Sequence, residues 1–146
     1  MRVVFDTNVL VAALVVEGLC TTLLARARRK HFQLFLCPFI LDELQHVLSK
    51  KLKTSEKLAR EAIDLVLEAA EGVVSPMEGV RGICRDRDDD HVLACALGAK
   101  ARYLVTGDKD LLELKEFRDI MILSPREFEM LFTAPSFKEI PSAFSR

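Results

Sequence analysis

Two aspartates of this sequence follow short apolar segments that are typical of buried β-strands. Asp6 comes directly after Val3-Val4-Phe5, and Asp108 comes three residues after the end of Tyr103-Leu104-Val105. In an open α/β sheet the functional crevice lies beyond the carboxyl ends of the strands, so both carboxylates are placed to reach it. An aspartate in such a position can also cap the next helix, and for Asp6 taken alone that explanation is equally good.

Asp90 lies in the first turn of a predicted helix, and its neighbours predict that it points toward the protein interior. The segment from His91 to Ala99 carries no other charge and is apolar nearly all round, which is typical of a buried helix. At about 100° per residue, Asp90 shares a helix face with Leu93, Ala94 and Leu97. Asp88 is the expected N-cap and Asp89 the expected solvent-exposed acid. A buried Asp90 needs a cation, or an arginine or lysine partner in an internal salt bridge, because the helix dipole offsets only about 1 kcal/mol of the cost of burial.

A fourth acid, Glu43, belongs to a helix predicted to begin near Pro38. It borders the apolar stripe of that helix on the side of Val47, whereas Asp42 points nearly the opposite way. Glu43 is therefore the one of two adjacent acids that can face inward. Many surface helices carry such a glutamate, so this signal is weak by itself.

Together, the four acids predict one cation site, since each comes from a different element and like charges repel unless a cation compensates them. Carboxylate oxygens without nearby histidine or cysteine ligands favour Mg²⁺ or Mn²⁺ over zinc. Such ions commonly activate water for attack on a phosphodiester. The histidines fall outside the pattern and are expected to be surface or packing residues: His31, His46 and His91.

The elements that must position these acids alternate along the chain, which predicts right-handed β-α-β crossovers. Strands are expected at 3–5, 33–36, 73–74, 103–105 and 121–123, and helices at 8–14, 20–29, 38–49, 56–70, 88–99, 109–114 and 125–132. The predicted fold class is α/β, with three α/β/α layers around a central, mostly parallel twisted sheet. One domain is expected over residues 1–133, followed by an extended or partly disordered tail at 134–146.

The composition is that of a globular protein with a sizeable core. Of 146 residues, 50% are hydrophobic and 29% are charged, which excludes intrinsic disorder or a coiled coil as the main character of the chain. The 21 Lys+Arg residues nearly balance the 22 Asp+Glu residues, so a large positive field is not the basis of any nucleic-acid binding. Two local basic clusters, residues 26–31 and 50–57, are either solvated helix ends or phosphate-binding groups that flank the crevice.

Whole-chain features predict a cytoplasmic protein without a membrane span. The apolar start of the chain is interrupted by Asp6 and Asn8 and closed by Glu17, well short of the roughly 20 apolar residues that a span requires. The cysteines are widely spaced and include no C-x-x-C pair: Cys20, Cys37, Cys84 and Cys95. We therefore expect neither a disulfide scaffold nor a structural zinc site, and interpret each cysteine as a small core residue.

Four sequence motifs resemble those of the PIN domain, the metal-dependent ribonuclease fold found in VapC-like toxins. The first is Phe5-Asp6-Thr7-Asn8-Val9-Leu10, and the second is Leu41-Asp42-Glu43-Leu44. The third is the acidic run at 88–90 with the small-residue helix after it, and the fourth is Val105-Thr106-Gly107-Asp108, at the end of a strand. The closing segment 122–128 also fits the subgroup of toxin components, and the resemblance covers about residues 2–131.

The resemblance implies a role for each matching residue. The metal-binding and catalytic acids would be Asp6, Glu43, Asp90 and Asp108, with Asp110 as an auxiliary metal-binding acid. The choice of Asp90 within the acidic run rests on the spacing Asp-x-x-Leu-Ala. The residues that orient the first carboxylate and the substrate would be Thr7, Asn8 and Thr106, although a strand-terminal threonine such as Thr106 is also common for reasons of β-propensity.

The implied activity is that of a Mg²⁺- or Mn²⁺-dependent endoribonuclease, the toxin of a toxin–antitoxin pair, with RNA as substrate, an antitoxin as partner and a homodimer as assembly. The alternative is an inactive PIN fold that binds RNA or a protein partner. A phosphate-transfer domain of the haloacid dehalogenase kind also begins with strand-Asp, but it needs a second aspartate where this chain has Asn8.

Overall fold

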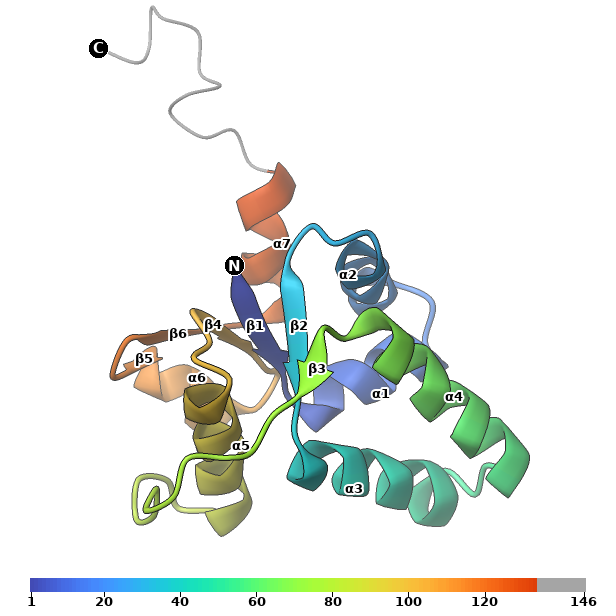
Figure 1. Cartoon of the computed structure of the whole chain (residues 1–146), viewed down its shortest axis with the longest axis horizontal. Helices are drawn as coiled ribbons and strands as arrows, with labels where there is room; N and C mark the ends of the chain where they lie inside the picture. The colour runs from blue at the N-terminus through green and yellow to red at the C-terminus, as the bar shows by residue number, and fades with distance from the viewer. Residues whose placement is uncertain (134–146) are drawn as a thin grey trace, which may run out of the picture.

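The computed structural model describes residues 1–133 of the chain (Figure 1). The tail predicted at 134–146 lies outside the described residues. The strands are β1 (Arg2–Phe5), β2 (Gln33–Leu36), β3 (Gly72–Val73), β4 (Tyr103–Val105), β5 (Glu116–Phe117) and β6 (Ile120–Leu123). The helices are α1 (Thr7–Val15), α2 (Leu19–Arg28), α3 (Pro38–His46), α4 (Glu56–Ala69), α5 (Arg87–Gly98), α6 (Lys109–Leu114) and α7 (Pro125–Thr133), and a π-helical turn (Val47–Lys51) continues α3.

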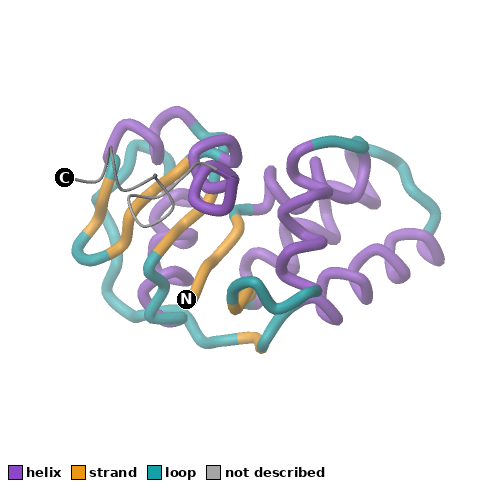
Figure 2. The backbone as a smooth tube through the Cα atoms, turned by 90° about the horizontal axis from the view of Figure 1, so that it is seen from above, coloured by secondary structure: helices purple, strands orange, loops and turns teal. Residues whose placement is uncertain are grey.

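The six strands form one sheet in the order β3-β2-β1-β4-β6-β5. All neighbouring pairs are parallel except β5 and β6, which form an antiparallel hairpin at the edge. Helices lie on either side of the strands, and α1–α4 extend to one side of the sheet, on the right in Figures 1 and 2. The predicted α/β fold with a mostly parallel sheet is confirmed.

The strand order places a crevice between β1 and β4. From β1 the chain adds β2 and β3 on one side and then returns to add β4 and β6 on the other, so the direction of winding reverses between β1 and β4. Ligands of open α/β sheets bind at such a switch point, beyond the carboxyl ends of the strands. Phe5 pairs with Val105 at these ends, which brings the residues that follow them together.

The short apolar segments of the sequence form strands that are buried in the core. Val3, Val4 and Phe5 of β1 are completely buried, as expected for a parallel strand that is covered on both faces. The ring of Phe5 packs against Phe32 and, edge to face, against Phe128 of α7, with ring centroids 5.6 and 6.1 Å apart. These contacts fix the strand whose end carries Asp6.

Two element boundaries differ from those expected. The strand β5 was not predicted; it forms because Lys115 and Arg118, both with positive φ, turn the chain on either side of Phe117. Helix α5 begins at Arg87 rather than Asp88, because the side chain of Asp86 caps it and accepts a hydrogen bond from the Asp88 amide at 2.9 Å. The acidic run at 88–90 therefore lies wholly within the first turn of α5.

The expectation of four unpaired cysteines is wrong for two of them. Cys37, at the N-cap of α3, and Cys95, in the middle of α5, form a disulfide, and both are fully buried. They are 58 residues apart in sequence, but the sheet places the end of β2 beside α5. Cys20 and Cys84 are free thiols.

Among the described residues, no single helix is long and apolar enough to cross a membrane. Helices α1 and α2 reach the required length and hydropathy only together, and the chain bends by 100° between them.

Candidate metal centre

The carboxylate of Asp6 lies at the end of β1 and is held on both oxygens. The backbone amide of Thr7 donates to Oδ1 at 2.7 Å, and the hydroxyl of Thr106 donates to Oδ2 at 2.8 Å. The amide of Asn8 also donates to Oδ2, at 3.2 Å. Asp6 caps α1, so its position follows both from the strand end and from the helix start.

Thr106 connects the two strand ends. Its hydroxyl accepts a hydrogen bond from the backbone amide of Asp108 at 3.0 Å while it donates to Asp6. The side-chain oxygen of Asn8 accepts from the Gly107 amide, also at 3.0 Å. The structure thus brings the predicted residues Asn8 and Thr106 next to Asp6 and Asp108. The orientation of the first carboxylate depends on this network.

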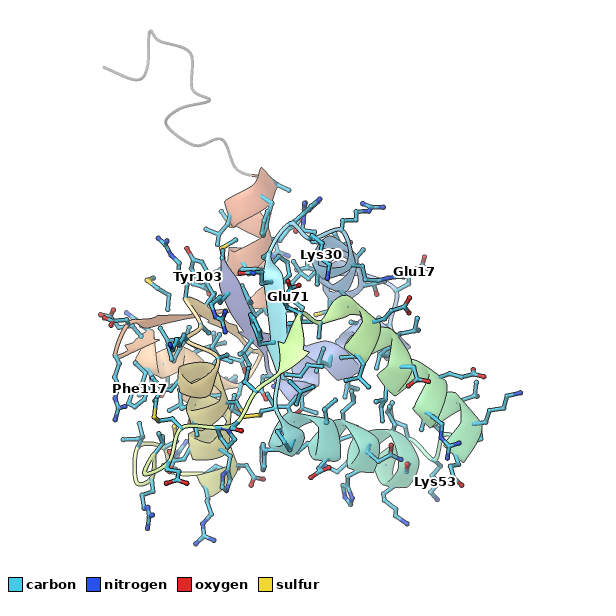
Figure 3. All side chains as sticks on the ribbon, in the orientation of Figure 1. Glu17, Lys30, Lys53, Glu71, Tyr103 and Phe117 are labelled. Atoms are coloured by element: carbon cyan, nitrogen blue, oxygen red, sulfur yellow. A yellow bond between two sulfur atoms is a disulfide. The ribbon has the colours of Figure 1, made fainter. Side chains whose placement is uncertain are left out.

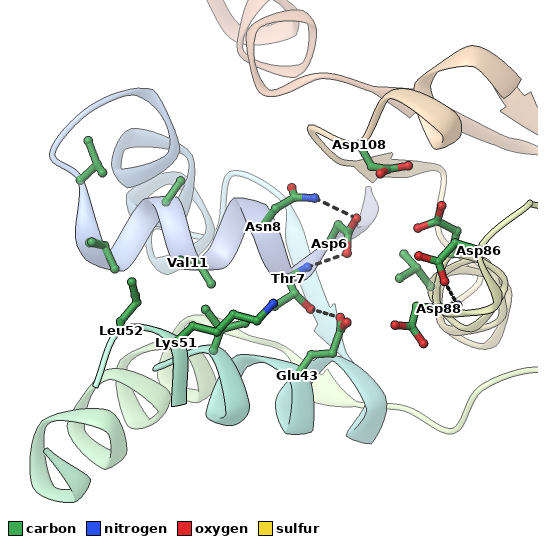
Figure 4. A pocket seen from close by; sticks show the side chains of 16 residues that line it. Asp6, Thr7, Asn8, Val11, Glu43, Lys51, Leu52, Asp86, Asp88 and Asp108 are labelled. Carbon is green, nitrogen blue, oxygen red and sulfur yellow. Dashed lines mark hydrogen bonds between the residues drawn. The ribbon is translucent and has the colours of Figure 1, made fainter. Parts of the chain in front are cut away.

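Glu43 reaches the same place from α3. Its Oε1 accepts a hydrogen bond from the hydroxyl of Thr7 at 2.6 Å, and its side chain is half-buried. The neighbouring Asp42 is exposed to solvent, as the helical pattern predicts. The side chains of Thr7 and Glu43 both face the pocket described below (Figure 4).

The structure does not bring Asp90 to the other acids. Asp90 is buried, but its two oxygens accept hydrogen bonds from the amides of Gly82, at 2.9 Å, and Cys84, at 2.8 Å. These amides compensate the buried carboxylate, so it needs neither a cation nor a salt bridge. Asp89, expected to be solvated, is buried instead and lines the pocket with Asp6 and Glu43. The predicted burial of Asp90 in the first turn of the helix is confirmed, but the structure places Asp89, not Asp90, in the pocket with Asp6 and Glu43.

Asp108 and Asp110 complete the acidic cluster. Oxygen atoms of Asp89, Asp108 and Asp110 all lie within 4.8 Å of one another. Asp108 caps α6 through a 3.0 Å bond from the amide of Leu111, while Asp110 pairs with the exposed Arg85 at 2.7 Å. The predicted auxiliary acid is thus beside Asp108, on the outer edge of the cluster.

One end of a pocket of about 540 Å³ is lined by Asp6, Glu43, Asp89 and Asp108. The acidic end also contains Asp86 and Asp88, which face Asp6 across the pocket (Figure 4). The other end is apolar and is lined by Val11, Ala12, Val15, Val16, Val47 and Leu52. Lys51 extends along the pocket toward Thr7 and Glu43 (Figure 4).

Asp86 was missing from the predicted site because residues 77–87 were expected to form a loop, and no role was assigned to this aspartate. The alternation Arg85-Asp86-Arg87-Asp88 was the signal that could have found it. An aspartate followed by a helical acidic run is a good N-cap, and Asp86 caps α5 here. The packing of α5 against β1 and α3 then turns Asp89 rather than Asp90 toward the pocket.

The buried carboxylates repel one another and resist ionisation. Burial raises the pKa of Asp6 from 3.8 to about 6; the bonds from Thr106 and Thr7 oppose this rise, and the charges of Glu43 and Asp108 add to it. Burial and then the charge of Asp108 raise the pKa of Asp89 as well. A bound dication would offset this repulsion.

A divalent ion fits the donor set of this site. The pocket offers carboxylate oxygens from several elements and, among the described residues, no histidine or cysteine lines it. Hard cations such as Mg²⁺ and Mn²⁺ prefer such ligands. The nearby free thiol of Cys84 is unsuited to act as a nucleophile or metal ligand, because burial and the adjacent Asp90 raise its pKa to about 12.

The two basic clusters, residues 26–31 and 50–57, lie at different distances from the carboxylate pocket. Arg26 forms a two-pronged ion pair with Glu129 at 2.7 and 2.9 Å, and Lys30 pairs with Glu71 near the start of β2 (Figure 3). That cluster lies at the amino ends of the strands, away from the carboxylates. Of the second cluster, Lys51 lines the pocket, whereas Lys53 lies at the outer end of the helices (Figure 3).

Comparison with known families decides the family of the chain. The sequence model of the PIN domain matches residues 2–110, a span from β1 into α6 that contains every acid of the pocket. The chain belongs to the PIN domain family. A search of curated proteins returned no match.

A solved structure supports the same fold. This PIN domain resembles a chain in the crystal structure of VapBC2 from Rickettsia felis bound to a DNA fragment from their promoter. The TM-score is 0.64 at 18% sequence identity, and the match covers 85% of this chain and 98% of the other. At this level of identity the likeness concerns the fold.

Without metal, the PIN domain should lose stability as the pH rises from about 4 to 7. Because the pKa of Asp6 is about 6 when folded and 3.8 ordinarily, folded Asp6 retains a proton that the unfolded chain has lost. The folded state binds more protons over this interval, so the free energy of unfolding falls with rising pH, by about 3 kcal/mol for Asp6 alone. Unfolding of wild type and Asp6→Asn in EDTA at pH 5 and 7.5 isolates this group. A stability difference that is the same at both pH values contradicts the prediction.

Proposed function

We propose that this PIN domain protein is a Mg²⁺- or Mn²⁺-dependent endoribonuclease that hydrolyses phosphodiester bonds of RNA. The observation that carries the proposal is the convergence of Asp6, Glu43, Asp89 and Asp108 on one pocket at the switch point of the sheet. Four elements contribute these acids, and none of the four carboxylates forms an ion pair with an arginine or lysine within residues 1–133.

The residues have distinct roles in this proposal. Asp6, Asp89 and Asp108 would hold the ion, Asp110 would support Asp108 from the edge, and Glu43 would accept a proton from the attacking water. A bound divalent ion supplies Lewis-acid activation of the phosphodiester and lowers the pKa of a water molecule. Asp90 has no part in this chemistry, because its oxygens are occupied by loop amides.

Three polar residues fix the acids in place. Thr106 holds Asp6 and the amide of Asp108 at once, so it sets the separation of these two carboxylates. Asn8 ties Asp6 to the Gly107 amide, and Thr7 orients Glu43 through its hydroxyl. Such supporting bonds are worth about 10–100-fold in metal affinity or activity in metal sites. We assign Thr7, Asn8 and Thr106 as positioning residues.

The test is cleavage of a fluorogenic single-stranded RNA with Mg²⁺ or Mn²⁺ and with EDTA. We expect cleavage only with the ion, and its loss in Asp6→Asn and Glu43→Gln. Asp42→Asn is the matched control, because Asp42 adjoins Glu43 on α3 but is exposed to solvent. Cleavage that survives EDTA and both substitutions would overturn the mechanism. RNA binding without cleavage in any metal would instead support the inactive binding module.

We further propose that the protein is the toxin of a toxin–antitoxin pair and that it acts as a homodimer in the cytoplasm. The family and the likeness to a chain of the VapBC2–DNA complex support an antitoxin partner. Expression of wild type should arrest growth, and Asp6→Asn should not. Rescue by the product of an adjacent small gene, and co-purification with it, would identify the antitoxin. Sedimentation of the purified protein tests the dimer.

A further inference from the structure

A second pocket, of about 720 Å³, lies beside the carboxylates and is rich in arginine. It is formed by the loop between β3 and α5 together with the first turns of α5. Its charged lining residues are Arg81, Arg85, Arg87, Glu78 and Asp90, and His91 also faces it. We name the segment from Met77 to Arg87 the arginine loop.

The start of α5 separates the two pockets by charge. In the alternating stretch 85–88, Asp86 and Asp88 line the carboxylate pocket, whereas Arg85 and Arg87 line the second one. Arg85 reaches across to the acidic cluster through its 2.7 Å bond to Asp110. The arginine loop, which carries three arginines beside Glu78 and Asp86, therefore directly adjoins the proposed cleavage site.

Hydrogen bonds hold the backbone of the loop, which sets the positions from which its arginine side chains extend. Both oxygens of Asp90 bind loop amides, those of Gly82 and Cys84, and the amide of Met77 donates to the carbonyl of Ala94 at 2.9 Å. Gly79 and Gly82 have φ values of +84° and +73°, which turn the chain where a side chain would be strained. Because this backbone is already ordered, a ligand that binds the loop does not pay the entropy cost of ordering it.

Two of the arginines are available to a ligand. Within residues 1–133, the side chains of Arg81 and Arg87 have neither a hydrogen-bond nor an ion-pair partner, and both residues are exposed. Within the same residues, neither acid of this pocket forms an ion pair with them: Asp90 accepts hydrogen bonds from amides, and Glu78 is exposed. His91 is fixed against Phe39, with ring centroids 4.7 Å apart.

We infer that Arg81 and Arg87 bind backbone phosphates of single-stranded RNA next to the bond that is cleaved. The inference rests on the proposed function and adds the path of the substrate. A pocket with six carboxylates repels RNA, so binding needs cations beside it. Arginine binds phosphate through its guanidinium group, which is planar and carries several N–H hydrogen-bond donors. A single strand is flexible enough to pass from the carboxylates over the start of α5 to the arginine loop, with Lys51 on the opposite side of the site.

The test compares two double variants of equal charge. Arg81→Gln/Arg87→Gln removes the proposed contacts, and Arg28→Gln/Arg126→Gln removes two exposed arginines of α2 and α7 that line neither pocket. We expect KM for a single-stranded RNA to rise about tenfold or more in the first variant only, with kcat and Mn²⁺ affinity close to wild type. The slope of log affinity against log salt should become shallower by about 1.4 for two lost phosphate contacts. Arg81→Lys/Arg87→Lys should restore part of the affinity.

Direct binding is measured by fluorescence anisotropy with Asp6→Asn as the parent, since cleavage is then blocked. Equal KM and equal salt slopes for the two double variants would overturn the inference while wild-type cleavage leaves the proposed function intact. A wild type that neither binds nor cleaves RNA would overturn both. If polyglutamate displaced RNA from the arginine loop as well as RNA of equal charge does, the loop would be a general anion surface and the inference would be wrong.

Discussion

Asp89→Asn is expected to reduce metal-dependent RNA cleavage by more than about 100-fold, because it removes a charged ligand where supporting contacts alone are worth 10–100-fold. Asp89 is buried, lines the carboxylate pocket and has an oxygen within 4.8 Å of Asp108 and Asp110 oxygens. The substitution removes one of several repelling charges, so the metal-free fold should become more stable at neutral pH. Cleavage of the fluorogenic RNA measures the first effect, calorimetry with Mn²⁺ shows whether it comes from lost metal binding, and thermal unfolding in EDTA measures the gain in stability.

Asp90→Asn is the matched comparison, since it changes the next residue of the same helix. An asparagine offers one acceptor oxygen, and its NH₂ group faces an amide donor of Gly82 or Cys84. We expect a loss of about 1–3 kcal/mol in the free energy of unfolding, and Mn²⁺ affinity close to that of wild type. Loss of Mn²⁺ binding in Asp90→Asn with full binding in Asp89→Asn would show that our assignment is reversed.

Reduction of the Cys37–Cys95 disulfide is expected to lower the free energy of unfolding by about 4 kcal/mol, because the bond closes a long loop in the unfolded chain. For a chain of this size, that corresponds to a fall in Tm on the order of 10 °C. Thermal unfolding with and without a phosphine reductant measures the effect, and thiol counting before and after reduction confirms the state of the bond.

Two double variants control the disulfide experiment. Cys37→Ala/Cys95→Ala should unfold at the same temperature with and without reductant, whereas Cys20→Ala/Cys84→Ala should keep the wild-type difference, since these two cysteines are free thiols. An unchanged wild-type Tm after complete reduction contradicts the prediction. The bond joins the start of α3, which carries Glu43, to α5, which carries Asp89, so reduction should also weaken Mn²⁺ binding.

Local patterns were sufficient to locate most elements and three of the four acids of the proposed site, Asp6, Glu43 and Asp108. Apolar triplets such as Val3-Val4-Phe5 predict strands because a parallel strand is buried on both faces. Parallel strands end at one edge, so Asp6 and Asp108 were bound to meet once two such strands became neighbours. The helical period likewise separates Glu43 from Asp42, because the apolar stripe of α3 must face the core.

Other features depended on contacts between segments that are distant in the sequence. Which acid of the run 88–90 enters the site follows from how α5 packs against β1 and α3, since adjacent residues of a helix point about 100° apart. The local sequence around Asp86 indicates where the helix begins, but it does not show which face of α5 lies toward the strand ends.

The pairing of the cysteines and the location of the basic residues likewise could not be predicted from local sequence patterns. Cys37 and Cys95 meet because the end of β2 lies beside α5, which is a consequence of strand order. Arg26 and Lys30 form ion pairs at the amino ends of the strands, while Arg81 and Arg87 lie beside the carboxylates. The sequence by itself determined the fold class and the acids at the strand ends, because both follow from local periodicity. Only the tertiary structure decided which helical acid, which cysteines and which cations adjoin the site, because those depend on packing between distant segments.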